Sequence, residues 1–442
     1  MAAPCPCLRS TDSYPRQFGA ANGYPGVLTS PTVITGQPHI PIGPAIDRYR
    51  GQLRFAARPR PVSLRTDQAN YRSSVTDVPT CNHRPVDYND DGEVAWDQVA
   101  HAYGPAVEVP GWISGLRDPS IAASCLSELY GSITHQGTRY SATPLAIPYL
   151  IEAAHDPAVP DRAGVIFLIQ FCATGNSGDC LDWRCQRDLQ TSPHERASWD
   201  AVAAGHERLH GLLADPDRAV AGAALTLLAW TGDASNRVLT AIRQALDSED
   251  DRDQCNGWLS SVVLGQLPPG QAAPTRLNTP GGPGRFGAAV ASIRFGGSST
   301  PPEAVDELCS VFASIESGEA VMTSEFLMAE EPAWVAALAL ATTPAHLRDH
   351  ANAQLRTAIA RGFVLGTSPL RAYLKLNLGE SRPPVTADAL PAEAREALLK
   401  LLDPLNNWRN APTIGHRIYE LEEYSLPGMP DHLATWLQAT PS

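Results

Sequence analysis

Apolar residues recur along the chain with the spacing of one face of an α-helix. In the segment 142–150 they occupy relative positions 0, 3, 4, 7 and 8, which places them on the same side of a helix. The same spacing returns further along the chain, and no segment of comparable length alternates with a period of two. We therefore expect helices and no strands. The predicted apolar faces lie at 142–150, 220–228, 238–246, 305–313 and 394–402.

The predicted helices are short and come in pairs. Two of them fall within 96–150, with a turn at Asp118, and pairs of roughly 35 to 45 residues follow. Asp118, Asp156 and Asp215 each precede a proline, and we expect these aspartates to cap helix starts, with the proline in the first turn. Helices with one apolar face need neighbours on both sides, which is typical of an α-solenoid.

The segment from Leu212 to Trp230 resembles a HEAT repeat. Its sequence, LLADPDRAVAGAALTLLAW, has a leucine-rich first helix, an Asp-Pro turn and an alanine-rich second helix. It departs from the family pattern at Ala221, where that pattern often has arginine. The resemblance implies an all-α fold of the HEAT-like type, an α-α superhelix built from antiparallel helix pairs.

A longer resemblance is to HEAT-repeat domain-containing proteins of high-GC (actinobacterial) genomes. It is carried by Trp96, by the run HAYG at 101–104 and above all by HQGTRY at 135–140. It covers about residues 94–265. The resemblance supports the fold and adds nothing about the function.

The net charge of −13 is distributed unevenly along the chain. Residues 1–85 hold ten arginines and no lysine against four aspartates and no glutamate, so their charge is 10 − 4 = +6. The remaining residues therefore carry −13 − 6 = −19. The first part also holds twelve prolines and shows no helical periodicity. It is predicted to be a disordered, basic arm rich in proline and arginine.

Two interpretations of the arm stay open. In the first it is upstream sequence, with translation starting at Val86 or Val94, because the next methionine after Met1 is Met322. Detection of the full-length chain in cells would contradict that interpretation. In the second it is a functional tail whose arginines, clustered within 48–65, bind nucleic acid or an acidic surface.

Beyond the arm, three segments are predicted. HEAT-like repeats occupy 86–267, a linker rich in proline and glycine occupies 268–285, and less regular helical repeats occupy 286–442. No apolar run reaches the ~18 to 20 residues that a membrane-spanning helix needs. No apolar run follows a basic N-terminal patch either, so we expect a cytoplasmic protein with reduced cysteines.

The sharpest chemical motif is an HExxH sequence at 206–210. On one helix, His206 and His210 would project from the same face and could bind zinc, while Glu207 could activate a zinc-bound water. A third ligand at the expected spacing is missing, because the next glutamate is Glu249. His206 also shares an apolar stripe with Val202. The pattern favours a structural role at the edge of the core over a zinc-dependent hydrolase.

A second candidate for zinc surrounds a predicted insertion at 174–191. Cys180 and Cys185 have four residues between them, a spacing that structural zinc sites use, with Cys172 and His194 nearby in the sequence. Cys172 lies on an apolar stripe, however, and the chain has no CxxC pair. We therefore predict no metal site. The chain also lacks a Walker-type or dinucleotide-binding glycine loop, so we expect no cofactor.

The polar segment 135–140 is the best candidate for contact with a partner. Its predicted partner-binding residues are His135, Gln136, Arg139 and Tyr140. The alternative is structural: His135 and Gln136 would cap the preceding helix, and Tyr140 would pack against the next one. No serine, cysteine or pair of carboxylates close to this segment in the sequence indicates catalysis.

Two classes of function agree with these patterns. The first is a non-enzymatic scaffold or adaptor whose acidic solenoid binds a protein partner, with a preference for basic partners. The second is an enzyme on the same fold, of the lyase or DNA glycosylase type. Glycosylases need a basic groove for phosphates, and the chain has only two lysines, Lys375 and Lys400. Nucleic acid is therefore expected at most on the arm, and we predict no catalytic residue.

Overall fold

The computed structural model describes residues 94–175, 192–274, 277, 282–317, 332–361, 369–379, 386–406, 421–422 and 424–438. The chain divides into two units, and every described residue belongs to the second, His83–Ser442. The predicted arm at 1–85 therefore lies outside the described residues. The zinc candidates Cys180 and Cys185 lie outside them as well.

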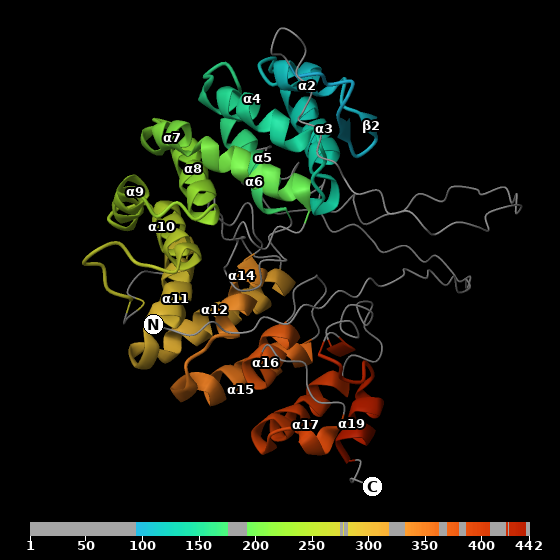
Figure 1. The fold of residues 1–442 in the computed structure, drawn as a ribbon. Helices are drawn as coiled ribbons and strands as arrows, with labels where there is room; N and C mark the ends of the chain where they lie inside the picture. The colour runs from blue at the N-terminus through green and yellow to red at the C-terminus, as the bar shows by residue number, and fades with distance from the viewer. Residues whose placement is uncertain are drawn as a thin grey trace, which may run out of the picture. The chain divides into compact units, whose positions relative to one another are not determined.

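Helices make up most of the described part of the chain, which confirms the predicted all-α class (Figure 1). The first helices are α2 (Val109–Gly115), α3 (Ala122–Ile133), α4 (Thr143–His155), α5 (Arg162–Thr174), α6 (Pro193–Ala204), α7 (His206–Leu209), α8 (Arg218–Trp230), α9 (Asn236–Leu246) and α10 (Asp251–Leu264). The later helices are α11 (Pro283–Phe295), α12 (Pro302–Ser317), α14 (Pro332–Leu340), α15 (Arg348–Arg361), α16 (Pro369–Leu378), α17 (Ala392–Asn406) and α19 (Pro430–Gln438). Short 3₁₀ helices are η1 (His135–Gly137), η4 (His210–Ala214), η5 (Gly297–Ser299), η6 (Ala345–Leu347) and η7 (Ala387–Ala389).

The expectation of no strands is wrong in one place. Strands β1 (Ala100–His101) and β2 (Gly104–Pro105) form an antiparallel hairpin. Each has two residues, too few to show a period of two in the sequence. The hairpin is fixed to its neighbours by the backbone N–H of Ala102, which donates to Ser132 at 3.0 Å, and by that of Ala142, which donates to Ala100 at 3.1 Å.

The predicted apolar faces are largely buried. In α8 all five predicted positions are fully buried, and in α12 the four described ones are buried. Tyr149 in α4 is an exception, because 41% of its surface is exposed. Its ring packs against Trp96 with the ring centres 6.1 Å apart, so one neighbour covers only part of it. Within the described ranges, no helix is long and apolar enough to cross a membrane.

Helices pack mainly against helices that are close to them in chain order. Helix α4 contacts α2, α5 and α6, while α5 also contacts α3 and α8, and α8 contacts α10. The pattern continues in the second half, where α12 contacts α11, α14 and α15, and α15 contacts α16 and α17. The helices therefore bury their apolar faces against helices that lie one to three positions away in chain order.

The aspartates of the Asp-Pro steps do not cap helix starts, contrary to expectation. Asp156 accepts a hydrogen bond from the backbone N–H of Ala158 at 2.9 Å, which makes a short turn. The residue before a proline is disfavoured in the helical conformation, and Asp156 is extended, with ψ of 114°. The chain therefore turns first and enters the helix later, and α5 is capped by Asp161 instead.

Arginine side chains of one helix pair form ion pairs with aspartates in the turns of the next pair. The contact is closest at Asp215, whose two carboxylate oxygens accept from Arg162 at 2.7 and 2.9 Å. These side chains are only 10% and 15% exposed, and the hydrogen bonds from Arg162 lower the pKa of Asp215. Successive helix pairs are thus joined by charged contacts as well as by apolar packing. The pairs are Arg117–Asp156, Arg162–Asp215 and Arg218–Asp250.

Helix α11 begins within the predicted linker. It starts at Pro283, although the linker was expected to reach residue 285. Proline suits the first turn of a helix because its missing N–H is not needed there. Gly284 follows because Asp251 lies against it: a Cβ at Gly284 would be 2.4 Å from Asp251 Oδ1. The described residues 268–274 are outside helices, as predicted.

Cys172, predicted to lie on an apolar stripe, is buried, and so is Cys309, which lies within the predicted apolar face 305–313. Burial raises the pKa of Cys172, and it raises the pKa of Cys309 to about 12. Because the thiolate is the reactive form, we expect both thiols to resist iodoacetamide in the folded protein at about pH 8. They should be alkylated once urea unfolds the chain. Peptide mapping by mass spectrometry measures this, and equal labelling of folded and unfolded protein would contradict it.

Candidate functional site

Four aromatic rings form a row along the hairpin and the neighbouring helix ends. The ring centre of Tyr103 lies 6.0 Å from that of His101 and 5.5 Å from that of His135. On its other side His101 lies 5.7 Å from Trp112 of α2. Tyr103 is the most exposed large hydrophobic residue of the described part, with 70% of its surface accessible. We call these four residues, His101, Tyr103, Trp112 and His135, the aromatic row.

A hydrogen bond to Nδ1 of His101 fixes the tautomer of its neutral ring. Its Nδ1 accepts from the backbone N–H of Tyr103 at 3.0 Å, so the neutral ring carries its proton on Nε2. Nε2 is buried and has no hydrogen-bond partner among the described residues. The carboxylate of Glu108 lies 3.5 Å from it, and the Glu108 side chain is 55% exposed. An acidic group therefore stands beside the row.

The predicted partner-binding residues are in different environments. His135 joins the aromatic row, and its Nδ1 also lies 3.0 Å from the carbonyl oxygen of Gly131, at the end of α3. Gln136 is exposed and has a left-handed backbone, with φ of 51°. Tyr140 is half-buried, and burial raises its pKa. Arg139 is only 7% exposed, so it is not a surface residue in this structure.

Arg139 lies where α5 ends and α6 begins. It donates to the carbonyl oxygen of Gly137 at 2.5 Å, and its Nη2 is 3.7 Å from Oε1 of Glu195, in the first turn of α6. Gly175, the residue after α5, leaves space for the guanidinium: a Cβ there would be 1.8 Å from Nη1. Arg139 therefore contacts both sides of the segment 176–191, which itself lies outside the described residues.

The HExxH motif does not lie on one helix, contrary to the prediction. Helix α6 ends at Ala204, α7 begins at His206, and His210 already belongs to η4. Within the motif, the change from α7 to η4 falls between Leu209 and His210. The earlier break at Gly205 separates α6 from α7, and a Cβ there would be 2.3 Å from Cδ1 of Ile151 in α4, so glycine allows α4 to pack closely just before the motif.

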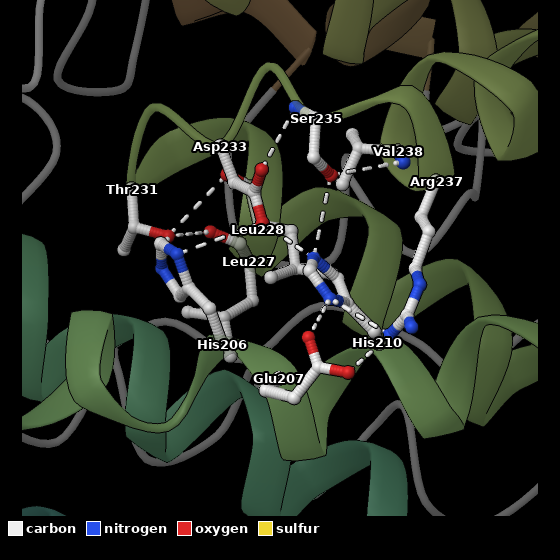
Figure 2. A network of polar contacts seen from close by, with 10 residues as sticks. All are labelled: His206, Glu207, His210, Leu227, Leu228, Thr231, Asp233, Ser235, Arg237 and Val238. Carbon is white, nitrogen blue, oxygen red and sulfur yellow. Dashed lines mark hydrogen bonds and ion pairs between the residues drawn. The ribbon is translucent and has the colours of Figure 1, made fainter.

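Both histidines of the motif face Asp233, in the turn between α8 and α9 (Figure 2). His210 Nε2 lies 2.6 Å from Asp233 Oδ2, and His206 Nδ1 lies 3.5 Å from the same oxygen. His206 Nε2 lies 2.9 Å from Oγ1 of Thr231. The backbone N–H of Ser235 donates to Asp233 Oδ1 at 2.9 Å. These contacts join the α7–η4 segment to the α8–α9 turn.

The electrostatics of this network follow from burial and hydrogen bonding. Burial alone would raise the pKa of Asp233, but hydrogen bonds from Ser235 and His210 outweigh it and lower that pKa. Burial lowers the pKa of His206. Glu207 binds Arg237 at 2.6 Å and lies 3.5 Å from Nδ1 of His210, and the hydrogen bond from Arg237 lowers the Glu207 pKa.

The geometry differs from that of a zinc protease. Glu207 is directed to Arg237 (Figure 2), and Ser235 is engaged as the cap of α9 through the N–H of Val238. Within the described ranges, no group of three or more histidine, cysteine or acidic residues is arranged to hold a metal ion. Sequence reasoning missed Asp233 because it sought a glutamate or histidine as the third ligand. The available signal was the Asp-x-Ser pattern of a turn before a helix.

We expect the stability of the protein to fall in mild acid partly because of His206. An unfolded histidine titrates near pH 6.5, and the folded ring takes up the proton less readily. The stabilisation that His206 contributes is therefore fully present above pH 6.5. It is lost as the pH falls from there through the lower folded pKa, by no more than about 1.4 kcal/mol per pH unit. Urea unfolding at several pH values measures it. His206→Gln, which keeps a partner for Thr231, should flatten the dependence, and an unchanged slope would contradict the assignment.

Comparison of the chain with models of protein families, with curated proteins and with solved structures found no match.

Proposed function

We propose that the protein is a HEAT-like helical scaffold that binds a protein partner with a basic surface and catalyses no reaction. The observation that carries the proposal is the packing of helices against near neighbours in chain order, from α2 to α17. Repeat proteins are built in this way, because each repeat buries its apolar face only against the adjacent repeats. The resemblance of the segment 212–230 to a HEAT repeat points to the same class.

The charged contacts between helix pairs support the same proposal. Arg162 reaches forward along the chain to Asp215, and Arg117 reaches Asp156 in the same sense. Such contacts fix one helix pair relative to the next, which a scaffold needs in order to present a continuous surface. They are also local, as expected where stability is a sum of neighbouring interfaces.

The charge of the chain supports a basic partner. Residues 86–442 carry a formal charge of −19, because the whole chain carries −13 and residues 1–85 carry +6. A large negative charge raises the rate of association with basic proteins and repels nucleic acid. The proposed partner is therefore a protein with a basic surface.

Affinity purification with the full chain as bait, from an extract of its native cells, tests this function. We expect one basic protein to be recovered in stoichiometric amount and to be released as salt increases, since salt screens charged contacts. An unrelated protein of similar pI, about 5.4, serves as the control for non-specific binding. Recovery of nothing beyond the control would contradict the proposal. Arg139 is too buried to serve as a surface probe in this experiment.

A further inference from the structure

We propose that the aromatic row is the contact surface for the partner and that it binds an arginine side chain. This inference rests on the proposed scaffold function and names its surface. It is carried by three features: the exposed and fixed ring of Tyr103, a carboxylate beside the neighbouring His101, and a buried nitrogen of the His101 ring without a hydrogen-bond partner among the described residues.

The ring of Tyr103 is exposed and yet fixed at both ends. Its backbone N–H donates to His101, and its hydroxyl lies 3.2 Å from Nδ1 of His135. The planes of these two neighbouring rings make angles of 69° and 65° with that of Tyr103. The neighbours therefore hold the ring but leave 70% of the residue accessible. A fixed ring loses little conformational freedom on binding, which favours its use as a contact.

The charge around the row favours a cation. The exposed carboxylate of Glu108 lies beside His101. The described arginines nearest in sequence are not available to oppose it, because Arg117 binds Asp156 and Arg139 is buried. An aromatic face with an adjacent carboxylate attracts a guanidinium, which can stack on the ring and pair with the acid.

His101 provides a second and independent indication. Its Nε2–H is buried with 7% of the side chain exposed, and it makes no hydrogen bond within the described part of the chain. Buried donors normally have a partner. The closest acidic oxygen, on Glu108, is 3.5 Å away. A guanidinium bound at the aromatic row would attract the Glu108 carboxylate. This movement would bring the Glu108 oxygen within hydrogen-bonding distance of Nε2–H of His101.

Calorimetric titration of the full-length protein with a blocked peptide of alternating arginine and glycine tests the inference. Three variants are compared with the unaltered chain: Tyr103→Leu, Tyr103→Phe and Glu108→Gln. Leucine keeps apolar bulk but has no π face, so Tyr103→Leu should weaken binding about threefold to tenfold. Tyr103→Phe keeps the π face and loses only the hydroxyl contact with His135, so it should weaken binding clearly less. Glu108→Gln should weaken binding to a degree similar to Tyr103→Leu. Asp349→Asn, which removes one exposed charge in α15, is the matched control and should have little effect.

The outcomes separate the inference from the function on which it rests. The inference is overturned if the peptide does not bind, if Tyr103→Leu and Tyr103→Phe behave alike, or if Asp349→Asn weakens binding as much as Glu108→Gln. Sedimentation that shows a dimer lost in Tyr103→Leu would also overturn it, by assigning the surface to a second copy of the chain. A partner that the Tyr103→Leu variant still captures from extract overturns only this surface, while the absence of any partner overturns the scaffold function as well.

Discussion

Replacement of Asp215 by alanine should lower the free energy of unfolding by about 2 to 4 kcal/mol. The carboxylate accepts two hydrogen bonds from Arg162, and both side chains are at least 85% buried. The substitution therefore leaves a largely buried guanidinium without its partner, which is the costly way to break such a pair. Urea unfolding followed by circular dichroism measures the loss.

Two comparisons sharpen this experiment. Asp156→Ala removes the corresponding contact with Arg117, but there the arginine side chain is 42% exposed and makes one hydrogen bond, so the loss should be clearly smaller. A double-mutant cycle with Arg162→Met isolates the interaction with Asp215, and a coupling near zero would contradict it. Because Arg162 lowers the pKa of Asp215, the stabilisation should persist from neutral pH down to the unfolded pKa and disappear as the pH falls through the folded value.

Gly175→Ala should destabilise the protein by about 2 to 5 kcal/mol. Two costs add at this position. The backbone of Gly175 has φ of 68° and ψ of −145°, a region that residues with a Cβ rarely adopt. The new Cβ would also lie 1.8 Å from Nη1 of Arg139, which is buried and bound to Gly137, and so cannot simply move away.

Gly232→Ala is the matched control for Gly175→Ala. Gly232 also has a positive φ, 75°, but nothing lies within 4 Å of the Cβ that would be added. This variant should therefore show only the backbone cost, about 1 to 2 kcal/mol. Unfolding curves of the two variants, recorded side by side, separate the contact with Arg139 from the conformational preference. Equal losses would show that Arg139 is free to rearrange.

The features that could be predicted from the sequence are those that depend on neighbouring residues. The apolar positions of 220–228 follow the helical period, and they are buried because any helix with such a face must cover it. The turn near Asp118 and the burial of Cys172 were predictable for the same reason. Periodicity is a local property of the backbone, so the sequence displays it directly.

The features that escaped prediction depend on residues distant in the chain. Helix α6 ends just before the HExxH motif, at Gly205, where Ile151 of α4 packs closely. Arg139 is a predicted partner-binding residue, yet its side chain is buried. Gly175 has no Cβ that would collide with the guanidinium, and the carboxylate of Glu195 lies close to its charge. Charged residues are seldom buried unless they are paired, and the sequence does not display such pairs. The hairpin that presents Tyr103 is too short to leave a pattern at all.

The position of Arg139 has a consequence for protein engineering. Because this side chain touches Gly175 and lies near Glu195, the chain leaves α5 and enters α6 at neighbouring points. A substitution that moves the Arg139 side chain should therefore affect the end of α5 and the start of α6 together. This junction is accordingly a position to leave unchanged when the described helices are redesigned.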